Sequence, residues 1–134
     1  MDSRDLVNEA MTAAKQSYAP YSRFRVGAAL ECEDGTIVLG ANVENRSFGM
    51  TICAERSAIV SAISSGKRKF TRIAIYSPDS DYPLSPCGAC RQVLSEFLPP
   101  EALVVLSDKD QNAIELTLGT LLPHDGLQEL KDRV

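Results

Sequence analysis

Hydrophobic and polar positions follow one another along the chain in patterns that predict alternating helices and short strands. From Ser3 to Tyr18, apolar residues recur every three or four positions, which is the spacing of a helix with one buried face, and Pro20 follows. Two short apolar runs, Val26 to Cys32 and Thr36 to Ala41, flank Asp34-Gly35. Because an Asp-Gly pair favours a tight hairpin, these two runs are expected to pair as antiparallel strands.

The rest of the chain continues this alternation of helix and strand patterns. A second helix carries a buried face from Ala58 to Ile63 and stops at Gly66. The later segments are a strand, a helix and two more strands, before a short C-terminal helix or tail: Arg72 to Ser77, Pro86 to Leu98, Leu103 to Ser107 and Ala113 to Leu118. Strands that alternate with helices need crossover connections, so we expect one α/β domain over residues 1–134, with a mixed sheet of about five strands covered by helices on both faces.

Composition and charge exclude several classes of function. The 134 residues include 14 Lys and Arg against 18 Asp and Glu, for a net charge of -4, with 6% aromatic residues. Nucleic-acid surfaces need a basic face and stacking rings, so no polymer partner is expected. No run reaches the roughly 18 apolar residues of a membrane span, and the first residues lack a signal peptide's apolar stretch. The chain therefore reads as a cytoplasmic protein whose partner is a small molecule.

A basic run follows the second helix, at Lys67, Arg68, Lys69 and Arg72. Cations beyond the C-terminus of a helix complement its dipole, and polyanion binding needs a basic domain around such a run. We interpret the run as a solvated surface.

Three of the four cysteines lie where the two middle helices are expected to begin. Cys87 and Cys90 are three residues apart and share one helix face, while Cys53 precedes the second helix. Ser85 is the expected N-cap of the third helix and Pro86 its first residue. Helices that follow strands begin at the same sheet edge, so the three thiols can converge. Helix N-termini favour thiolates, and three thiolates suit tetrahedral zinc with one position open for water. The pattern predicts a catalytic zinc centre.

Two charged residues follow Cys53 closely. Glu55 faces a different side of the opening turn, so it is placed to exchange protons with the water that the metal activates and with a substrate. Arg56 comes next. Three thiolates around Zn²⁺ leave a net charge of about -1, and a guanidinium that hydrogen-bonds a thiolate sulfur would offset it. We expect Glu55 to be catalytic and Arg56 to tune the charge of the zinc site.

Four ordered stretches resemble the small, all-cysteine cytidine deaminases. They are Tyr21-Ser22-Arg23-Phe24-Arg25-Val26-Gly27-Ala28-Ala29, Asn42-Val43-Glu44-Asn45, Cys53-Ala54-Glu55-Arg56-Ser57-Ala58 and Ser85-Pro86-Cys87-Gly88-Ala89-Cys90-Arg91-Gln92-Val93-Leu94. The resemblance covers nearly the whole chain. It implies a three-layer α-β-α sandwich, zinc held by Cys53, Cys87 and Cys90, and Glu55 as the proton shuttle.

The resemblance also implies an activity and a substrate site. The activity is hydrolytic deamination of cytidine and 2′-deoxycytidine to uridine and 2′-deoxyuridine, with release of ammonia, in pyrimidine salvage. Phe24 is expected near the base, Asn42 and Glu44 on the ribose hydroxyls, and Ala54 in the same substrate site. The family's oligomer is a homotetramer with shared active sites, to which Phe48 and the C-terminal tail contribute across an interface.

The C-terminal tail departs from the family pattern. The family follows Leu-Leu-Pro with two residues and then a Phe that stacks on the base of a neighbour's substrate, whereas this chain has Gly126 there. A lost stack costs about 1 kcal/mol in base binding. His124 is expected as a solvated loop residue, and Arg46 is bulkier than the small residue common at its position. This departure keeps a rival open: a related deaminase of modified cytosine nucleosides, of the blasticidin type.

Other interpretations of the same residues are less favoured. Cys32 as a fourth ligand would make a closed structural zinc site, but its strand position is typical of a buried hydrophobic residue. A redox pair of Cys87 and Cys90 leaves the Cys53-Ala54-Glu55 stretch unexplained. A binding module without activity would reduce Glu55 to a carboxylate favoured by the helix dipole. Editing of polynucleotides needs a basic channel that the composition does not supply.

Overall fold

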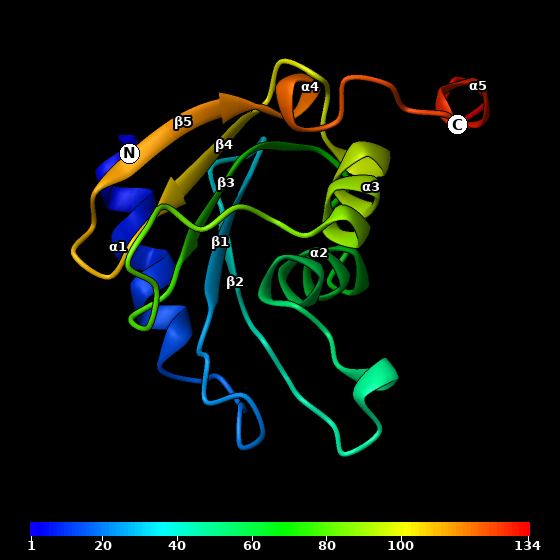
Figure 1. The fold of residues 1–134 in the computed structure, drawn as a ribbon. Coiled ribbons are helices and arrows are strands. Elements are labelled where there is room, and N and C mark those ends of the chain that lie inside the picture. The colour runs from blue at the N-terminus through cyan, green and yellow to red at the C-terminus, as the bar shows by residue number, and fades with distance from the viewer.

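The computed structural model describes all 134 residues and forms one sheet with helices on either side (Figure 1). The elements follow in the order α1 (Ser3–Ala14), β1 (Gly27–Cys32), β2 (Ile37–Ala41), the 3₁₀ turn η1 (Phe48–Met50), α2 (Ala54–Ser64), β3 (Phe70–Tyr76), α3 (Gly88–Phe97), β4 (Leu103–Ser107), β5 (Ala113–Thr117), α4 (Leu118–Leu121) and α5 (Gln128–Lys131). None of these helices combines the length and apolar character needed to cross a bilayer.

The sheet has five strands in the order β2-β1-β3-β4-β5. β3 and β4 run parallel, and every other neighbouring pair is antiparallel. The β1–β2 hairpin turns at Gly35, whose φ of 88° is a conformation that glycine adopts without strain. The mixed five-stranded sheet predicted from the alternation of elements is therefore confirmed, together with the antiparallel hairpin.

Successive residues of β1 face opposite layers of the sandwich. Ala29 points into a core formed with α1, whereas Ala28 and Leu30 point into the larger core beneath α2 and α3. All three are fully buried. Figure 1 shows α1 alone on one face of the sheet and the pair α2 and α3 on the other. This is the three-layer arrangement that the family resemblance implies.

Two glycines let helices touch the backbone of the sheet. A Cβ at Gly27 would stand 2.0 Å from the Ala10 carbonyl oxygen of α1. A Cβ at Gly40 would stand 2.3 Å from the backbone nitrogen of Ala58, in α2. No side chain fits at these separations. Glycine at position 40 therefore allows α2, with the residues at its N-terminus, to lie directly against the backbone of β2.

The first helix is shorter than the sequence pattern indicated. It ends at Ala14 rather than reaching Tyr18, whose side chain is exposed. The Tyr18 backbone N–H donates to Asn42 O at 3.0 Å, and its carbonyl accepts from Glu44 N at 2.8 Å. Because both backbone groups pair with the segment after β2, Tyr18 is held in an extended bridge and cannot continue the helix.

The start of α3 also differs from the prediction. Cys87, not Ser85, is the N-cap, and Pro86 lies outside the helix, which begins at Gly88. Cys87 is extended, with φ -67° and ψ 167°, and its carbonyl accepts the first helical bond from Arg91 N at 3.0 Å. The Ser85 hydroxyl instead accepts from the Arg91 guanidinium at 2.7 Å. The Ser85 side chain therefore hydrogen-bonds a residue of the first turn of α3 and does not cap the helix.

Candidate metal centre and substrate pocket

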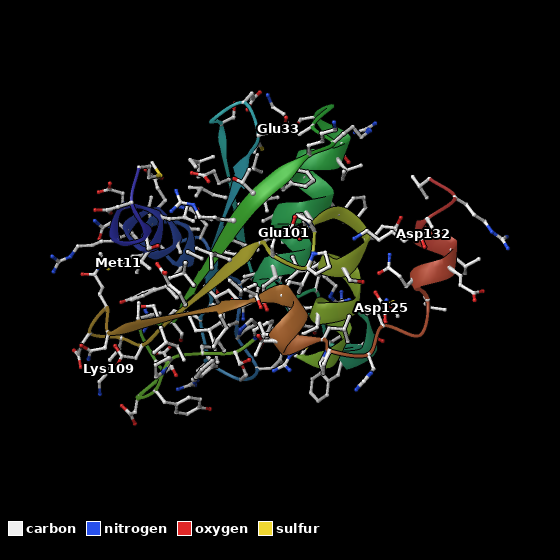
Figure 2. All side chains as sticks on the ribbon, turned by 90° about the horizontal axis from the view of Figure 1, so that it is seen from above. Met11, Glu33, Glu101, Lys109, Asp125 and Asp132 are labelled. Carbon is white, nitrogen blue, oxygen red and sulfur yellow. The ribbon has the colours of Figure 1, made fainter.

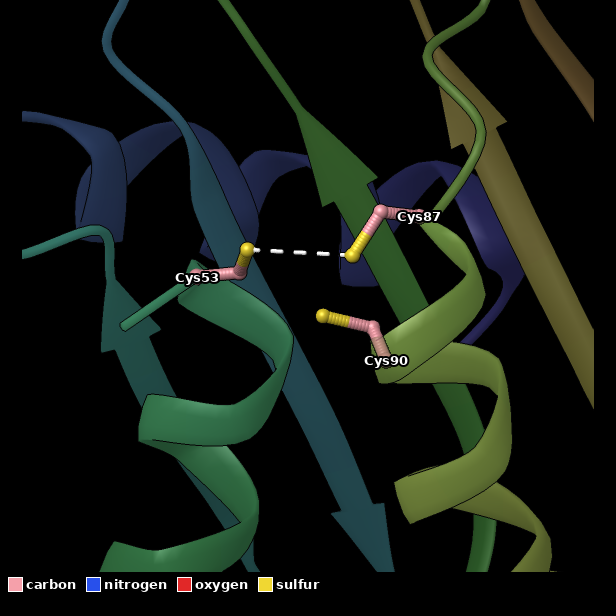
Figure 3. Close-up of side chains that lie close together, drawn as sticks. All are labelled: Cys53, Cys87 and Cys90. Carbon is pink, nitrogen blue, oxygen red and sulfur yellow. Dashed lines mark hydrogen bonds between the residues drawn. The ribbon is translucent and has the colours of Figure 1, made fainter. Parts of the chain in front are cut away.

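Three sulfur atoms from two helix starts converge on one point (Figure 3). Cys53 is the N-cap of α2, and Cys87 is the N-cap of α3, with Cys90 one turn further along. Their sulfur atoms all lie within 4.8 Å of one another, and the Cys53 and Cys87 sulfurs are 4.0 Å apart. The convergence predicted from the helix spacing and the sheet edge is confirmed.

The sulfur positions fit a zinc ion. Zinc–sulfur bonds of about 2.3 Å in tetrahedral geometry separate two sulfurs by about 3.8 Å, close to the separation between Cys53 and Cys87. Cys32 lies outside this group, in the core beneath α2 and α3, with 2% of its surface exposed. The chain thus brings together three sulfur donors and no fourth, which leaves one coordination position for a water molecule.

Hydrogen bonding shifts the pKa values of Cys53 and Cys90 in opposite directions. A hydrogen bond from Cys90, reinforced by Arg56 and Cys87, lowers the pKa of Cys53 to about 5. The bond to the Cys53 thiolate, followed by burial, raises the pKa of Cys90. The Arg56 guanidinium donates to the Cys53 sulfur at 3.6 Å, while its Nε is buried without a hydrogen-bond partner. Arg56 therefore lies where the sequence placed it, with a cation against a ligand sulfur.

Glu55 is buried beside the sulfur cluster. Its side chain is 5% exposed, and burial raises the pKa of its carboxyl to about 7. A carboxyl that titrates near neutral pH can both accept and release a proton during a reaction. The residue lines the same cavity as Cys53 and Cys87, so it faces the space where a substrate would lie.

A cavity of about 300 Å³ opens onto the sulfur cluster. It contains the sequence-predicted residues Phe24, Asn42, Glu44, Ala54 and Glu55. Its remaining lining residues are Ser22, Val26, Thr51, Cys53, Leu84, Ser85 and Cys87. Five of these were not predicted as site residues, although three of the five stand inside the family-like stretches: Ser22, Val26 and Ser85 do, and Thr51 and Leu84 do not. Small and apolar side chains carry no chemical signal of their own, so only their positions identify them.

Asn42 is 8% exposed, and its amide is already largely engaged within the chain. Its Oδ1 accepts hydrogen bonds from Val26 N at 2.9 Å and from the Ser17 hydroxyl. Its Nδ2 donates to the Phe24 carbonyl at 2.8 Å. Because both oxygen lone pairs are used, the side chain has one N–H left to offer a ligand in the cavity.

Glu44 likewise joins the cavity wall to the loop before β1. Its carboxylate accepts from the backbone N–H groups of Tyr21 and Ser22, at 3.0 and 3.1 Å, and from the Ser22 hydroxyl. These bonds hold the pKa of Glu44 below its usual range, so it is ionised at neutral pH. An ionised carboxylate in the cavity can accept hydrogen bonds from ligand hydroxyls.

Phe48 lies outside the cavity. It is 73% exposed in η1 and contacts the Tyr21 ring, with centroids 5.7 Å apart. The two rings line a neighbouring hollow that shares Ser22, Glu44 and Thr51 with the cavity. Within one chain, Phe48 is therefore beside the substrate pocket and not part of it.

The C-terminal tail is tied to α3 of its own chain by two hydrogen bonds, and its last helix, α5, stands at the edge of the molecule (Figure 2). Gln92 Nε2 donates to Asp125 at 3.3 Å, and Lys131 Nζ donates to the Leu98 carbonyl at 3.1 Å. His124 lines a separate hollow beneath this tail and takes no part in the cavity at the sulfur cluster. Arg46 is exposed. Neither residue contributes to the candidate site within one chain.

Comparisons with known proteins agree with this site. Residues 1–106 match the family described as the cytidine and deoxycytidylate deaminase zinc-binding region. A cytidine deaminase of Halalkalibacterium halodurans is 46% identical over 123 residues, covering 92% of each chain. The crystal structure of a Burkholderia pseudomallei cytidine deaminase superposes with a TM-score of 0.88 at 43% identity, over 92% of this chain and 98% of that one. A blasticidin-S deaminase of Bacillus cereus is 33% identical over 109 residues, or 76% of each chain. With its three-cysteine zinc site, the chain belongs to the small, all-cysteine type of the cytidine deaminase family.

Proposed function

We propose that this chain catalyses the zinc-dependent hydrolytic deamination of cytidine and 2′-deoxycytidine to uridine and 2′-deoxyuridine, with release of ammonia. The observation that carries the proposal is the buried Glu55 carboxyl, which shares one cavity with the Cys53 and Cys87 sulfurs. An open three-sulfur zinc site beside a titratable carboxyl is suited to hydrolysis. We place this activity in pyrimidine salvage and in the cytoplasm, where four free cysteines are compatible with reducing conditions.

Glu55 is the residue that moves protons in this proposal. Cys53, Cys87 and Cys90 would hold a zinc ion, which would supply an activated water as the nucleophile for C4 of the cytosine ring. The Glu55 carboxylate accepts the proton from that water and delivers it to N3 of the ring. It then takes the proton of the hydroxyl group now on C4 and carries it to the exocyclic nitrogen, which departs as ammonia while the C4 carbonyl forms.

Asn42 and Glu44 orient the nucleoside through its ribose. The one free N–H of Asn42 donates to a hydroxyl oxygen, and the Glu44 carboxylate accepts from a hydroxyl proton. Phe24 and Ala54 line the same cavity, and we assign them to contact with the base. This pairing of a donor with an acceptor favours a plain ribose or deoxyribose.

A panel of substrates tests the proposed activity. We expect the zinc-loaded protein to give the ultraviolet change of deamination with cytidine and deoxycytidine, and weaker responses with cytosine, which lacks the ribose contacts. Blasticidin S and 5-methylcytidine complete the panel, with zinc counted per chain in the same preparation. A response to blasticidin S alone, with one zinc bound, would replace the proposal by the rival activity.

An Arg56→Ala variant tests the charge-tuning role. Removing the cation beside the Cys53 sulfur is expected to weaken zinc binding, because the Cys53 thiolate loses a stabilising hydrogen bond, or to lower turnover by about tenfold, because the uncompensated charge of three thiolates reduces the ability of zinc to acidify water. Competition with a chelator measures the zinc affinity, and Arg56→Lys is the control that keeps the charge. The role is refuted if Arg56→Ala leaves both the zinc affinity and kcat unchanged.

We also propose that the chain acts as a homotetramer with shared active sites. Large hydrophobic side chains are exposed in the segment after β2, in η1 and on α2, at Val43, Phe48, Met50 and Val60. Such a surface on a soluble enzyme favours burial against another copy. Light scattering is expected to give the mass of four chains, and a Phe48→Asp variant to weaken both the assembly and the activity. A fully active monomer would contradict the shared-site arrangement.

A further inference from the structure

The segment from Tyr21 to Val26 forms one wall of the cavity without regular secondary structure. It contains a left-handed residue, Arg23, with a φ of 58°. Its backbone is held by side chains instead of strand pairing: Phe24 N donates to the Ser22 hydroxyl at 3.0 Å, and Val26 N donates to Asn42 at 2.9 Å. The position of the Phe24 ring therefore depends on a few individual side-chain contacts.

The peptide group that joins Phe24 to Arg25 is held at both of its polar atoms. Its carbonyl, on Phe24, accepts from Asn42 Nδ2 at 2.8 Å. Its N–H, on Arg25, donates to the Asp79 carboxylate at 2.9 Å. Asn42 follows β2 and Asp79 follows β3, and these strands are not adjacent in the sheet. Side chains from two separate parts of the fold therefore hydrogen-bond the same peptide group. A peptide bonded in this way cannot rotate without breaking a hydrogen bond, which fixes where the Phe24 side chain emerges.

The Asp79 carboxylate accepts three hydrogen bonds from Arg25. Besides the backbone N–H of Arg25, it accepts from Nε and from a terminal nitrogen of the same guanidinium, at 3.0 and 2.8 Å. Its own N–H donates to the hydroxyl of Ser77, a fully buried residue, at 3.1 Å. Three donors from a single residue, in a forked arrangement, make a geometrically specific contact. The Arg25 cation also holds the pKa of Asp79 below its usual range, so the carboxylate stays charged at neutral pH.

We propose that Asp79 is a positioning residue for the deaminase reaction: through the Phe24–Arg25 peptide it sets the place of the Phe24 ring against the base of the nucleoside. The inference rests on the proposed function and extends it to a residue outside the family-like stretches. It also links the β3–α3 connection, which carries Ser85 and Cys87, to the opposite wall of the cavity.

The same connection offers a matched control. Asp81 forms an ion pair with Lys109 at 2.6 Å, but both side chains are exposed and neither forms a hydrogen bond or ion pair with the segment from Tyr21 to Val26. Exposed pairs of this kind contribute little to stability. Asp79→Ala and Asp81→Ala remove the same charge from the same connection, so a difference between them reports on the contact with Arg25.

Kinetics give the first test. Asp79→Ala is expected to raise the KM for cytidine about tenfold with kcat changed by less than about threefold, since it loosens substrate placement and leaves the proton shuttle intact. Arg25→Ala, which retains the backbone bond to Asp79, is expected to have a smaller effect. Asp81→Ala should match the parent enzyme, and zinc content should be equal in all of them.

A double-mutant cycle separates positioning from general destabilisation. In a Phe24→Ala background, Asp79→Ala is expected to add less than about a twofold change in KM, because the ring it positions is absent. Fully additive effects would show that Asp79 acts independently of Phe24 and would overturn the inference.

A fluorescence measurement tests the placement without relying on activity. The chain has no tryptophan, so Phe24→Trp introduces a single probe at the cavity wall. Asp79→Ala is expected to increase the quenching of this probe by acrylamide and to lower its anisotropy, whereas Asp81→Ala leaves both unchanged.

Identical fluorescence and identical KM in the two aspartate variants would overturn the inference. If Asp79→Ala does not fold, the same readouts are taken on Asp79→Asn, which keeps the size of the side chain but loses its charge and one of its two acceptor oxygens. An inactive parent enzyme with a probe that responds as expected would instead count against the proposed function alone.

Discussion

A Glu55→Gln variant is expected to bind zinc and cytidine as the parent does while losing turnover by about 10²- to 10⁴-fold, the usual contribution of a positioned acid–base group. Gln has nearly the same shape, so it preserves the packing of a side chain that is 5% exposed. It cannot accept a proton from water or pass one to N3 of the base. Single-turnover deamination of cytidine, with binding measured separately by calorimetry, checks both halves of this expectation.

The result that would contradict the role of Glu55 is specific. Retention of more than about a tenth of the turnover, a penalty of no more than about 1.4 kcal/mol, is too small for loss of the proton shuttle. Glu101→Gln is the matched control, since Glu101 is an exposed carboxylate in the turn before β4 and does not line the cavity. That variant should behave as the parent in zinc content, binding and rate.

The second large effect is expected on removal of a metal ligand. Cys90→Ala should weaken zinc binding by at least about 100-fold and abolish detectable deamination, because only two sulfurs would remain. Cys90 is fully buried between α2 and α3, so the loss should also lower the thermal midpoint by removing the bond that zinc makes between the two helix starts. Metal analysis and calorimetry of the purified protein measure these changes.

Cys32→Ser is the matched control for this ligand variant. Cys32 is buried, as Cys90 is, but it is the last residue of β1 and belongs to the hydrophobic core beneath α2 and α3. Its substitution is expected to reduce stability, since a hydroxyl replaces a thiol among apolar side chains, and to leave one zinc per chain and full activity. Loss of zinc from Cys32→Ser, or retained zinc in Cys90→Ala, would show that the ligand set is wrong.

Much of the fold was predictable from local patterns. The spacing of apolar residues identified the helices, and Asp34-Gly35 identified the hairpin, because helix and turn preferences depend on residues within a few positions of one another. The same argument placed Cys87 and Cys90 on one helix face. The ends of the elements were less predictable. Tyr18 is held by hydrogen bonds to the segment after β2, and Ser85 by the Arg91 guanidinium six positions further along, and these bonds override the local preferences of both residues.

The sequence by itself determined the chemistry of the site: three thiols, a carboxylate two residues after the first, and a guanidinium beside it. Tertiary structure alone decided how that chemistry is enclosed. The sulfurs of Cys53 and Cys87 meet across 34 positions of chain, and Asp79 reaches Arg25 across 54. Contacts at such separations arise from how the layers pack, including the close approach of α2 to Gly40, and no local periodicity encodes them. For this reason the metal ligands could be identified before the structure, whereas the contact of Asp79 with the wall of the cavity could not.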